Sequence, residues 1–379
     1  MRRTTHLAAV TAVAITLTGC SLSSADSDGS SGSGSGSPST GASTAGSSSA
    51  GASTAAPKNK QVVLVTHDSF AAPKELLAQF TRETGYTVKV TPSGDAGQVA
   101  NKLVLTKGSP IGDAVYGIDN TFASRVVDAG VLDPYTPKAP AQGSQAYALK
   151  AGGDRLTPVD YGHTCVNVDT TWFAKKKLAP PRTFEDLTKP AYKNLMVAPG
   201  APTSSPGLAM LLATIGRYGE GGVTGGWSVY WHKLVANGLK ITSGWEDAYN
   251  VDFTQGEGKG DRPIVWSYDT SPAFTVKGGT STTAALLDTC FRQVEYAGVI
   301  KGAKNPEGAK ALVDWMQGRA FQQALPPNMY VFPVAQDAPL PADWQKFAKR
   351  PAKPYDVDPA TIAAKRQQWL TQWQDITSK

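Results

Sequence analysis

Histidine and cysteine are scarce in this chain, and their scarcity excludes several kinds of active site. The 379 residues include 4 His and 3 Cys, and neither an H-E-x-x-H nor a C-x-x-C motif occurs, so a catalytic zinc ion would lack its ligands. The sequence also has no G-x-S-x-G elbow, Walker loop or dinucleotide-binding fingerprint, which leaves hydrolases, ATPases and dehydrogenases without their defining residues. We therefore expect no catalytic residue, no resident metal and no cofactor.

Long hydrophobic runs are absent apart from one near the start of the sequence. That run covers about residues 7–17, follows an Arg pair and ends in L-T-G-C at Cys20. It is shorter than the ~20 residues of a membrane-spanning helix, and its pattern is typical of a secretory signal with a lipid-attachment site. We predict a signal peptide over residues 1–19 and a lipidated Cys20 that anchors the mature chain to the cell membrane. Sec and Tat export both stay open.

Large apolar side chains are almost missing from residues 20–57, which consist mainly of Ser, Gly, Ala and Thr. Such a segment cannot bury enough surface to offset the entropy of ordering it. We predict a flexible linker with a typical reach of ~30–35 Å, long enough to hold a folded domain clear of a membrane.

Strong charge of either sign is also missing. The formal net charge is +6, and the Lys and Arg residues are spread along the chain rather than grouped. No RNA-recognition signature or Arg-rich helix occurs, so we expect no nucleic-acid partner. Some attraction to an anionic membrane surface is the most that this charge implies.

Two cysteines remain once Cys20 is assigned to lipid. Cys165 and Cys290 each lie in a strand-like run, at residues 162–168 and 290–296, and an exported chain meets oxidising conditions. Adjacent strands would bring the two within bonding distance. We favour one disulfide, with two separate buried thiols as the alternative.

The remaining sequence, about 320 residues, suits two lobes better than one. Strand-like and helical patterns alternate along it, which predicts an α/β fold with a ligand cleft between the lobes, beyond the carboxyl ends of the strands. Trp369 and Trp373, one helical turn apart, are expected to pack rather than to bind ligand. Strands are expected at 61–66, 86–91, 114–118, 195–198, 239–242, 264–267 and 292–299, and helices at 73–84, 97–106, 206–218, 227–237, 248–254, 306–318 and 359–377.

Residues 264–274, I-V-W-S-Y-D-T-S-P-A-F, are the most informative stretch. An apolar strand pattern ends there in a hydroxyl-rich turn that opens a short helix. A similar turn, P-T-S-S-P-G at 202–207, and the segment G-W-E-D-A-Y at 244–249 strengthen the pattern. Aromatic faces, carboxylates and helix-end amides in these segments suit a small ligand that carries both positive and negative charge.

The order and spacing of such segments resemble the thiamine-binding family of periplasmic-type solute-binding proteins, the receptors of ABC importers. The resemblance runs from about residue 62 to the C-terminus. The segments that carry it are H-D-S-F at 67–70, G-I-D-N at 117–120, V-D-Y-G at 159–162, S-S-P-G-L at 204–208, G-W-E-D-A-Y at 244–249, S-Y-D-T-S-P-A at 267–273 and V-F-P-V at 331–334.

This resemblance implies a two-lobed periplasmic-binding-protein-like fold of type II, without catalysis. The implied ligand is thiamine or its mono- or diphosphate, and the implied partners are ABC permease and ATPase subunits. We place lobe 1 at residues 58–159 plus about 276–335, and lobe 2 at residues 160–275 plus about 336–379. A monomer is expected.

Thiamine chemistry selects the candidate site residues. The thiazolium cation needs aromatic faces, the aminopyrimidine a carboxylate or amide, and the hydroxyethyl arm backbone amides. Trp245 and Tyr268 are the first candidates for the aromatic faces, with core packing as their alternative. The expected ligand-binding residues are Asp95, Ala96, Ser204, Ser205, Trp245, Tyr268, Asp269, Thr270, Ser271, Pro272, His67, Asp119, Phe274 and Tyr330.

Several of these residues also have a purely structural interpretation. The Ser204–Ser205 pair precedes a Pro that suits the first helical turn, so it reads equally as a helix cap. A helix-cap role for Asp95 and a turn role for Asp119 explain these residues as well as ligand contact does. Asp160 reads as part of the hinge between the lobes rather than as a ligand contact.

Three positions depart from the family pattern. His67 stands where a Tyr is common, Phe274 lacks the hydroxyl of the usual Tyr, and Tyr330 replaces a common Trp. An aromatic ring is kept at each position, but the hydrogen bonds of the site change.

Rival functions fall into three classes. A polyamine receptor on the same fold is the main alternative, and its carboxylates could come in part from Asp95, Asp119, Glu246 and Asp269. A ferric-ion receptor is the weaker one, since Tyr268 is followed by Asp269 rather than by a second Tyr. A thiamine-degrading enzyme would use a Cys nucleophile, for which Cys165 would have to be unpaired and exposed. A structural adhesin on a stalk would not need a polar cleft.

Overall fold

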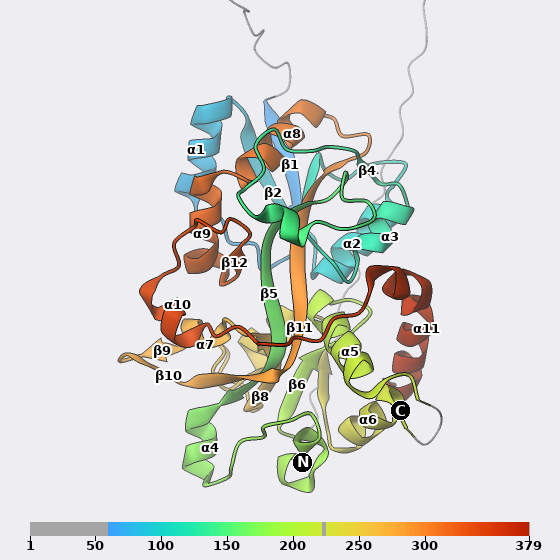
Figure 1. The fold of residues 1–379 in the computed structure, drawn as a ribbon, viewed down its shortest axis with the longest axis vertical. Coiled ribbons are helices and arrows are strands. Elements are labelled where there is room, and N and C mark those ends of the chain that lie inside the picture. Colours follow the sequence, from blue (N-terminus) through green and yellow to red (C-terminus); the bar gives the residue numbers. More distant parts are fainter. Residues whose placement is uncertain (1–59, 222–224, 379) are drawn as a thin grey trace, which may run out of the picture. The chain divides into compact units, whose positions relative to one another are not determined.

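A mixed sheet forms the frame of the protein. The structure is a computed structural model that describes residues 60–221 and 225–378. The predicted signal peptide, Cys20 and linker lie outside these residues. In the described part, ten strands join one sheet in the order β2-β1-β3-β11-β5-β8-β6-β7, with β4 paired to β11 and β12 paired to β5. Helices cover this sheet (Figure 1).

The strands alternate with the helices along the chain. The strands are β1 (Gln61–Thr66), β2 (Thr87–Pro92), β3 (Ala114–Asp119), β4 (Leu132–Asp133), β5 (Thr157–Asp169), β6 (Met196–Pro199), β7 (Lys240–Thr242), β8 (Ile264–Tyr268), β9 (Val276–Lys277), β10 (Thr280–Ser281), β11 (Thr283–Ile300) and β12 (Phe332–Pro333). The helices are α1 (Lys74–Thr84), α2 (Ala96–Leu105), α3 (Ala123–Asp128), α4 (Thr170–Lys176), α5 (Ser205–Tyr218), α6 (Trp227–Ala236), α7 (Ser271–Phe274), α8 (Pro306–Met316), α9 (Arg319–Met329), α10 (Ala342–Phe347) and α11 (Pro359–Thr377).

Two long antiparallel strands, β5 and β11, run through both lobes (Figure 1). The late part of β11 pairs with β3, and β3 joins the parallel β1–β2 pair. The late part of β5 pairs with β8, which joins the parallel β6–β7 pair. Each lobe therefore has its own parallel strands, and β5 and β11 are shared. The residue bounds that we assigned to the lobes stay a prediction.

Helix starts follow the rules that the sequence suggested. Ser204 is the N-cap of α5, and its hydroxyl accepts a hydrogen bond from the Gly207 amide at 3.3 Å. Asp358 caps α11 through the amides of Ala360 and Thr361. In both helices a Pro occupies the first turn, where the missing N–H costs no hydrogen bond.

Tryptophan side chains form part of the hydrophobic core. Trp369 and Trp373 of α11 are buried, and Trp373 packs edge-to-face on Trp231 of α6. The prediction that this Trp pair packs is therefore confirmed.

The element prediction missed the short helices α3, α4 and α10 and the short strands β4, β9, β10 and β12. It was also wrong at two further segments. Residues 248–254 were expected to form an ordinary helix, but Asp247–Asp252 form a π-helical turn. Helix α9 was missed because Pro326 and Pro327 lie inside it, and Pro normally breaks a helix interior. Among the described helices, none has the length and apolar character that a membrane crossing needs.

Cys165 of β5 and Cys290 of β11 form a disulfide, with their Cα atoms 4.2 Å apart. Both residues are fully buried. The bond therefore ties together the two strands that the lobes share, across 125 residues of sequence.

We expect loss of this disulfide to lower the free energy of unfolding by about 2–5 kcal/mol, because the bond closes a long loop in the unfolded chain. The measurement is urea unfolding of the oxidised protein and of a Cys165→Ala/Cys290→Ala double variant. Reduced wild-type protein is the matched control, since it loses the bond without losing side-chain atoms. Unfolding midpoints that agree for oxidised and reduced wild-type protein would contradict this expectation.

Candidate functional site

A cavity of about 410 Å³ lies where the strand ends of the two lobes meet. This volume is within the range of small-molecule binding pockets. Of the residues that the sequence suggested, ten line it: His67, Asp95, Ala96, Ser205, Trp245, Tyr268, Thr270, Ser271, Phe274 and Tyr330.

Aromatic rings make up much of the wall. Trp245 stacks on Tyr249 with ring centroids 5.0 Å apart, and it meets Tyr268 edge-on at 6.0 Å. The Trp245 indole N–H donates to the Ser267 hydroxyl at 3.1 Å, which fixes the plane of the ring. Phe274, which is 43% exposed, packs edge-to-face on Tyr330. Such rings offer faces to a planar or cationic ligand.

Asp95 connects the two lobes. It occupies the N-cap position of α2, yet its carboxylate makes no bond to its own helix. Instead Oδ1 accepts from the Ser205 amide at 3.1 Å, and Oδ2 accepts from the Trp245 amide at 2.9 Å. Burial raises the pKa of Asp95 above its usual range, against these hydrogen bonds, which lower it.

His67 follows β1 and faces a carboxylate. Its Nε2 lies 3.4 Å from Oε1 of Glu295, and both side chains are almost buried. Burial alone would lower the pKa of His67, but the charge of Glu295, with smaller contributions from Asp95 and Asp68, raises it above 6.5. The protonated imidazole is therefore favoured, and its charge is directed at Glu295.

Three carboxyl groups stand in one row on β3, β11 and β5. Glu295 is the cross-strand partner of Asp119 on one side and of Asp160 on the other. The Tyr116 hydroxyl lies 2.6 Å from Oδ2 of Asp160 and 3.1 Å from Oε2 of Glu295. Burial, followed by the charge of Glu295, raises the pKa of Asp160 well above its usual range. For Glu295 burial would raise the pKa, but the charge of His67 lowers it below its usual range. Of the two carboxyl groups, Asp160 is therefore the one whose protonated form the surroundings favour.

Four of the expected ligand residues do not line the cavity, and each has a structural role. Asp119 accepts from the amides of Thr121 and Phe122 in a turn, and burial raises its pKa to about 7. Ser204 caps α5, as described above. Pro272 is buried within α7.

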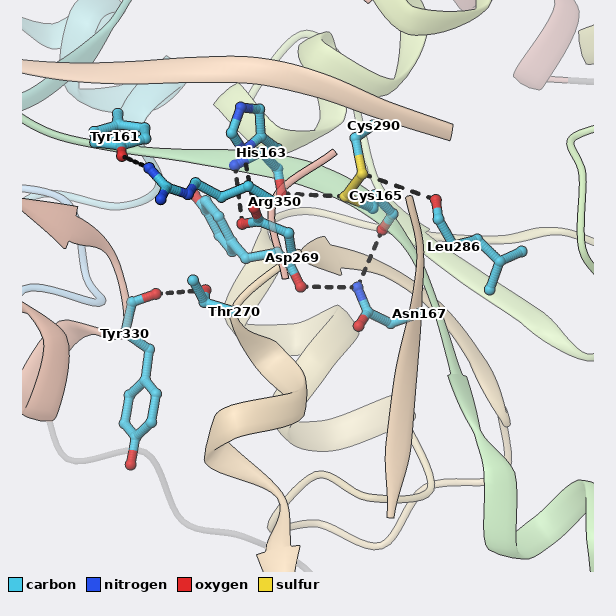
Figure 2. Close-up of polar contacts among 11 residues, drawn as sticks. Tyr161, His163, Cys165, Asn167, Asp269, Thr270, Leu286, Cys290, Tyr330 and Arg350 are labelled. Carbon is cyan, nitrogen blue, oxygen red and sulfur yellow. Dashed lines mark hydrogen bonds and ion pairs between the residues drawn. A yellow bond between two sulfur atoms is a disulfide. The ribbon is translucent and has the colours of Figure 1, made fainter. Parts of the chain in front are cut away.

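Asp269 is the fourth of these residues. Its Oδ2 lies 2.8 Å from Nδ1 of His163, and its Oδ1 accepts from the His163 amide (Figure 2). Burial raises the pKa of Asp269, while the contacts with His163 lower it. The side chain holds β5 against the end of β8 behind the cavity.

The hydroxyl-rich turn at the start of α7 is largely occupied by the protein itself. The Thr270 hydroxyl donates to the carbonyl of Tyr330 at 2.6 Å (Figure 2). The Ser271 hydroxyl lies 2.8 Å from that of Ser267 and accepts from the Tyr268 amide. This turn therefore joins the aromatic wall to the end of α9.

Sequence reasoning named Glu246 only for the polyamine alternative, and apart from Asp95 it missed the other acidic residues of the cavity wall. Glu246 and Asp247 follow Trp245 directly in a segment that the sequence had singled out, so their position was a usable signal. Glu295 gave no signal, since it lies in the middle of a long apolar strand. The carboxylates of the wall are Asp68, Asp95, Glu246, Asp247, Glu257 and Glu295.

A two-lobed fold with an aromatic and polar cavity at the strand ends is typical of a solute-binding protein. The sequence matches the family described as bacterial extracellular solute-binding protein over residues 109–356, and the chain belongs to that family. Its relatives are binding proteins rather than enzymes. Cys165 is moreover bonded to Cys290 and fully buried.

Particular relatives agree with the family resemblance predicted from sequence. A thiamine-binding periplasmic protein of Salmonella typhimurium is 30% identical over 339 residues, covering 86% of this chain and 96% of the relative. That of Brucella melitensis is 31% identical over 342 residues, covering 86% and 94%. A solved periplasmic thiamin binding protein superposes with a TM-score of 0.72 at 28% identity, covering 85% of this chain and 97% of that one.

Solved structures with lower sequence identity share the fold as well. The iron-bound protein HitA from Pseudomonas aeruginosa superposes with a TM-score of 0.64, but at 19% identity. This likeness shows the shared fold alone.

We expect NMR titration of His67 to give a pKa above 6.5, because the negative charge of Glu295 outweighs burial. Since the folded-state pKa is raised, protonated His67 stabilises the fold below pH 6.5, and this stabilisation is lost as the pH rises through the folded-state pKa. In Glu295→Gln the pKa of His67 should fall, because burial remains and the main opposing charge is gone. Asp68→Asn is the matched control and should lower it less. A pKa of His67 that is the same in Glu295→Gln and in wild-type protein would rule out the ion pair.

Proposed function

We propose that this protein captures thiamine in the cavity between its lobes and delivers it to an ABC importer. The observation that carries the proposal is a cavity wall that combines the aromatic faces of Trp245 and Tyr268 with several carboxylates. The names of the relatives, thiamine-binding periplasmic proteins, support the same ligand.

The chemistry of thiamine matches this wall. Its thiazolium ring carries a permanent positive charge, which aromatic faces and carboxylates stabilise. Its aminopyrimidine offers donors and acceptors to polar side chains such as Asp95 and Gln98, which both line the cavity. Closure of the two lobes would then remove the ligand from water.

The cellular setting is part of the proposal. A signal peptide over residues 1–19, a lipidated Cys20 and a linker to residue 57 would tether a monomeric receptor to the outer side of the cell membrane. Permease and ATPase subunits would be its partners. The lobe bounds of 58–159 plus about 276–335, and 160–275 plus about 336–379, belong to the same proposal.

A polyamine receptor is the second candidate. The carboxylates of the wall, among them Asp68, Glu246 and Glu257, favour a ligand with several positive charges. Polyamine sites combine such carboxylates with aromatic walls, so spermidine is the informative competitor.

Isothermal titration of the fragment from Lys58 should give one-to-one binding of thiamine without product formation. Trp245→Ala should weaken this binding roughly 10- to 100-fold, because it removes an aromatic face from a desolvated cation site. Trp172→Ala is the matched control: Trp172 lies on α4 outside the cavity wall, so its loss should leave the affinity unchanged.

The same titration separates the candidates. If spermidine binds and thiamine does not, the ligand is a polyamine rather than thiamine. Equal losses of affinity in Trp245→Ala and Trp172→Ala would contradict the placement of the ligand at Trp245.

A further inference from the structure

His67 and Glu295 form an ion pair in the wall of the cavity. Nε2 of His67 lies 3.4 Å from Oε1 of Glu295, and both residues line the cavity. This distance is longer than the ~2.7–2.9 Å of a charge-assisted hydrogen bond, and Nε2 has no hydrogen-bond partner within the described part of the chain. The other carboxylate oxygen of Glu295 accepts from the Tyr116 hydroxyl at 3.1 Å. The pair is therefore held by charge alone on the side that faces His67.

A glycine gives the imidazole its place. Gly117 of β3 has a φ of 94°, and an added Cβ there would lie 2.2 Å from Cδ2 of His67. A larger residue at this position would push the ring away from β3. The ring also lies 5.5 Å from that of Tyr116, measured between centroids. Close approach to the strand thus brings the imidazole within reach of Glu295 on the neighbouring strand β11.

Acidic groups surround this pair from every neighbouring element. The titratable groups that act on His67 or on Glu295 are Asp68 and Asp95 beside the imidazole, Tyr116 and Asp119 on β3, Asp160 on β5 and Tyr268 on β8. No Lys or Arg lines the cavity among residues 60–221 and 225–378. Protonated His67 is therefore the one cation that this described wall supplies, and it offsets part of the negative charge around it.

A ligand cation in the cavity would compete for the same negative charge. Tyr268, a candidate face for the cation, lies against β5, because an added Cβ at Gly162 would be 3.1 Å from its ring. Gly162 is two residues from Asp160, the cross-strand partner of Glu295. Burial, followed by the charge of Glu295, raises the pKa of Tyr268 well above its usual range. A cation stacked on Tyr268 is thus attracted by Glu295 and repelled by a protonated His67.

We propose that Glu295 is the counter-ion of the bound ligand cation, and that His67 releases its proton when this cation enters the cavity. The proton passes from the imidazolium to the solvent, so one positive charge leaves the cavity as another arrives. The inference rests on the proposed function, because the permanent charge of the thiazolium ring is the cation that replaces the imidazolium. Protons and ligand then compete, and the affinity falls as the pH falls through the pKa of His67.

The test is isothermal titration of wild-type protein with thiamine at one pH in two buffers that differ in their enthalpy of ionisation. The difference in heat gives the number of protons released. Near neutral pH we expect release of up to about one proton per thiamine, and an affinity at least about threefold lower at pH 6 than at pH 8, because proton release sets the slope of affinity with pH. Binding without proton release would overturn the inference and leave the proposed function intact. Absence of thiamine binding in both buffers would overturn the proposed function, and the inference with it.

Two variants test whether the proton comes from His67. His67→Gln removes the titrating group, whereas His232→Gln removes an exposed histidine of α6 outside the cavity wall. Proton release should be lost in His67→Gln and kept in His232→Gln. Undiminished release in His67→Gln would assign the proton to a carboxyl group and overturn the role of His67. Wild-type protein gives an independent readout, since the imidazole NMR signals of His67 should move toward those of the neutral ring when thiamine saturates the cavity.

The counter-ion is tested in the His67→Gln background, where no imidazolium competes for the carboxylate. Adding Glu295→Gln should weaken thiamine binding roughly tenfold, because a buried charge opposite the cation is lost. Adding Asp247→Asn is the matched control, since Asp247 also lines the cavity but is exposed. Its loss should weaken binding several-fold less, because water and salt screen an exposed charge. Equal losses would assign the attraction to overall charge and overturn the role of Glu295.

Discussion

The pairing of β5 with β11 is the constraint on which the rest of the structure depends. These two strands enter both lobes, so each lobe's parallel strands are positioned by the same pair. The pair also carries the Cys165–Cys290 bond and two carboxyl groups of the row, Asp160 and Glu295, of which Glu295 faces His67. A shift in register between β5 and β11 would therefore disturb the hinge, the disulfide and the charge balance of the cavity together.

The charges of the wall residues determine which ligands the cavity favours. The surroundings of Asp160 favour its protonated form, Glu295 is paired with His67, and Asp95 accepts hydrogen bonds from amides of the opposite lobe. Each buried carboxyl thus has a different solution to the cost of leaving water: protonation, ion pairing or hydrogen bonding. The remaining acids of the wall give the cavity a preference for cations, while the stacked Trp245 and Tyr249 provide the apolar surface that binding needs.

Much of the fold and of the candidate site could be predicted from the sequence, and the exceptions have physical reasons. Periodicity located most strands and helices, and turn chemistry placed Ser205, Trp245 and Tyr268 in one cavity wall. The turn pattern could not show which of Ser204 and Ser205 faces the cavity. Either serine of the pair could be the helix cap, and only the structure shows that Ser204 caps α5 and Ser205 lines the cavity. Sequence reasoning assigned Asp269 to the ligand because the partner, His163, lies 106 residues away. Glu295 was missed because a buried acid in a strand is recognisable only when its cross-strand partners are known.

The burial of the disulfide bears on the order in which the protein is assembled. Both sulfur atoms belong to fully buried residues, so an oxidant cannot reach them once β5 and β11 have paired and the helices cover the sheet. The bond has to form before the chain is fully packed, between residues whose separation in sequence is 125. The segment between them, including α4 to α7, then packs as a loop whose ends are already joined. A chain that folds before it is oxidised keeps two buried thiols that oxidants reach only when the fold opens.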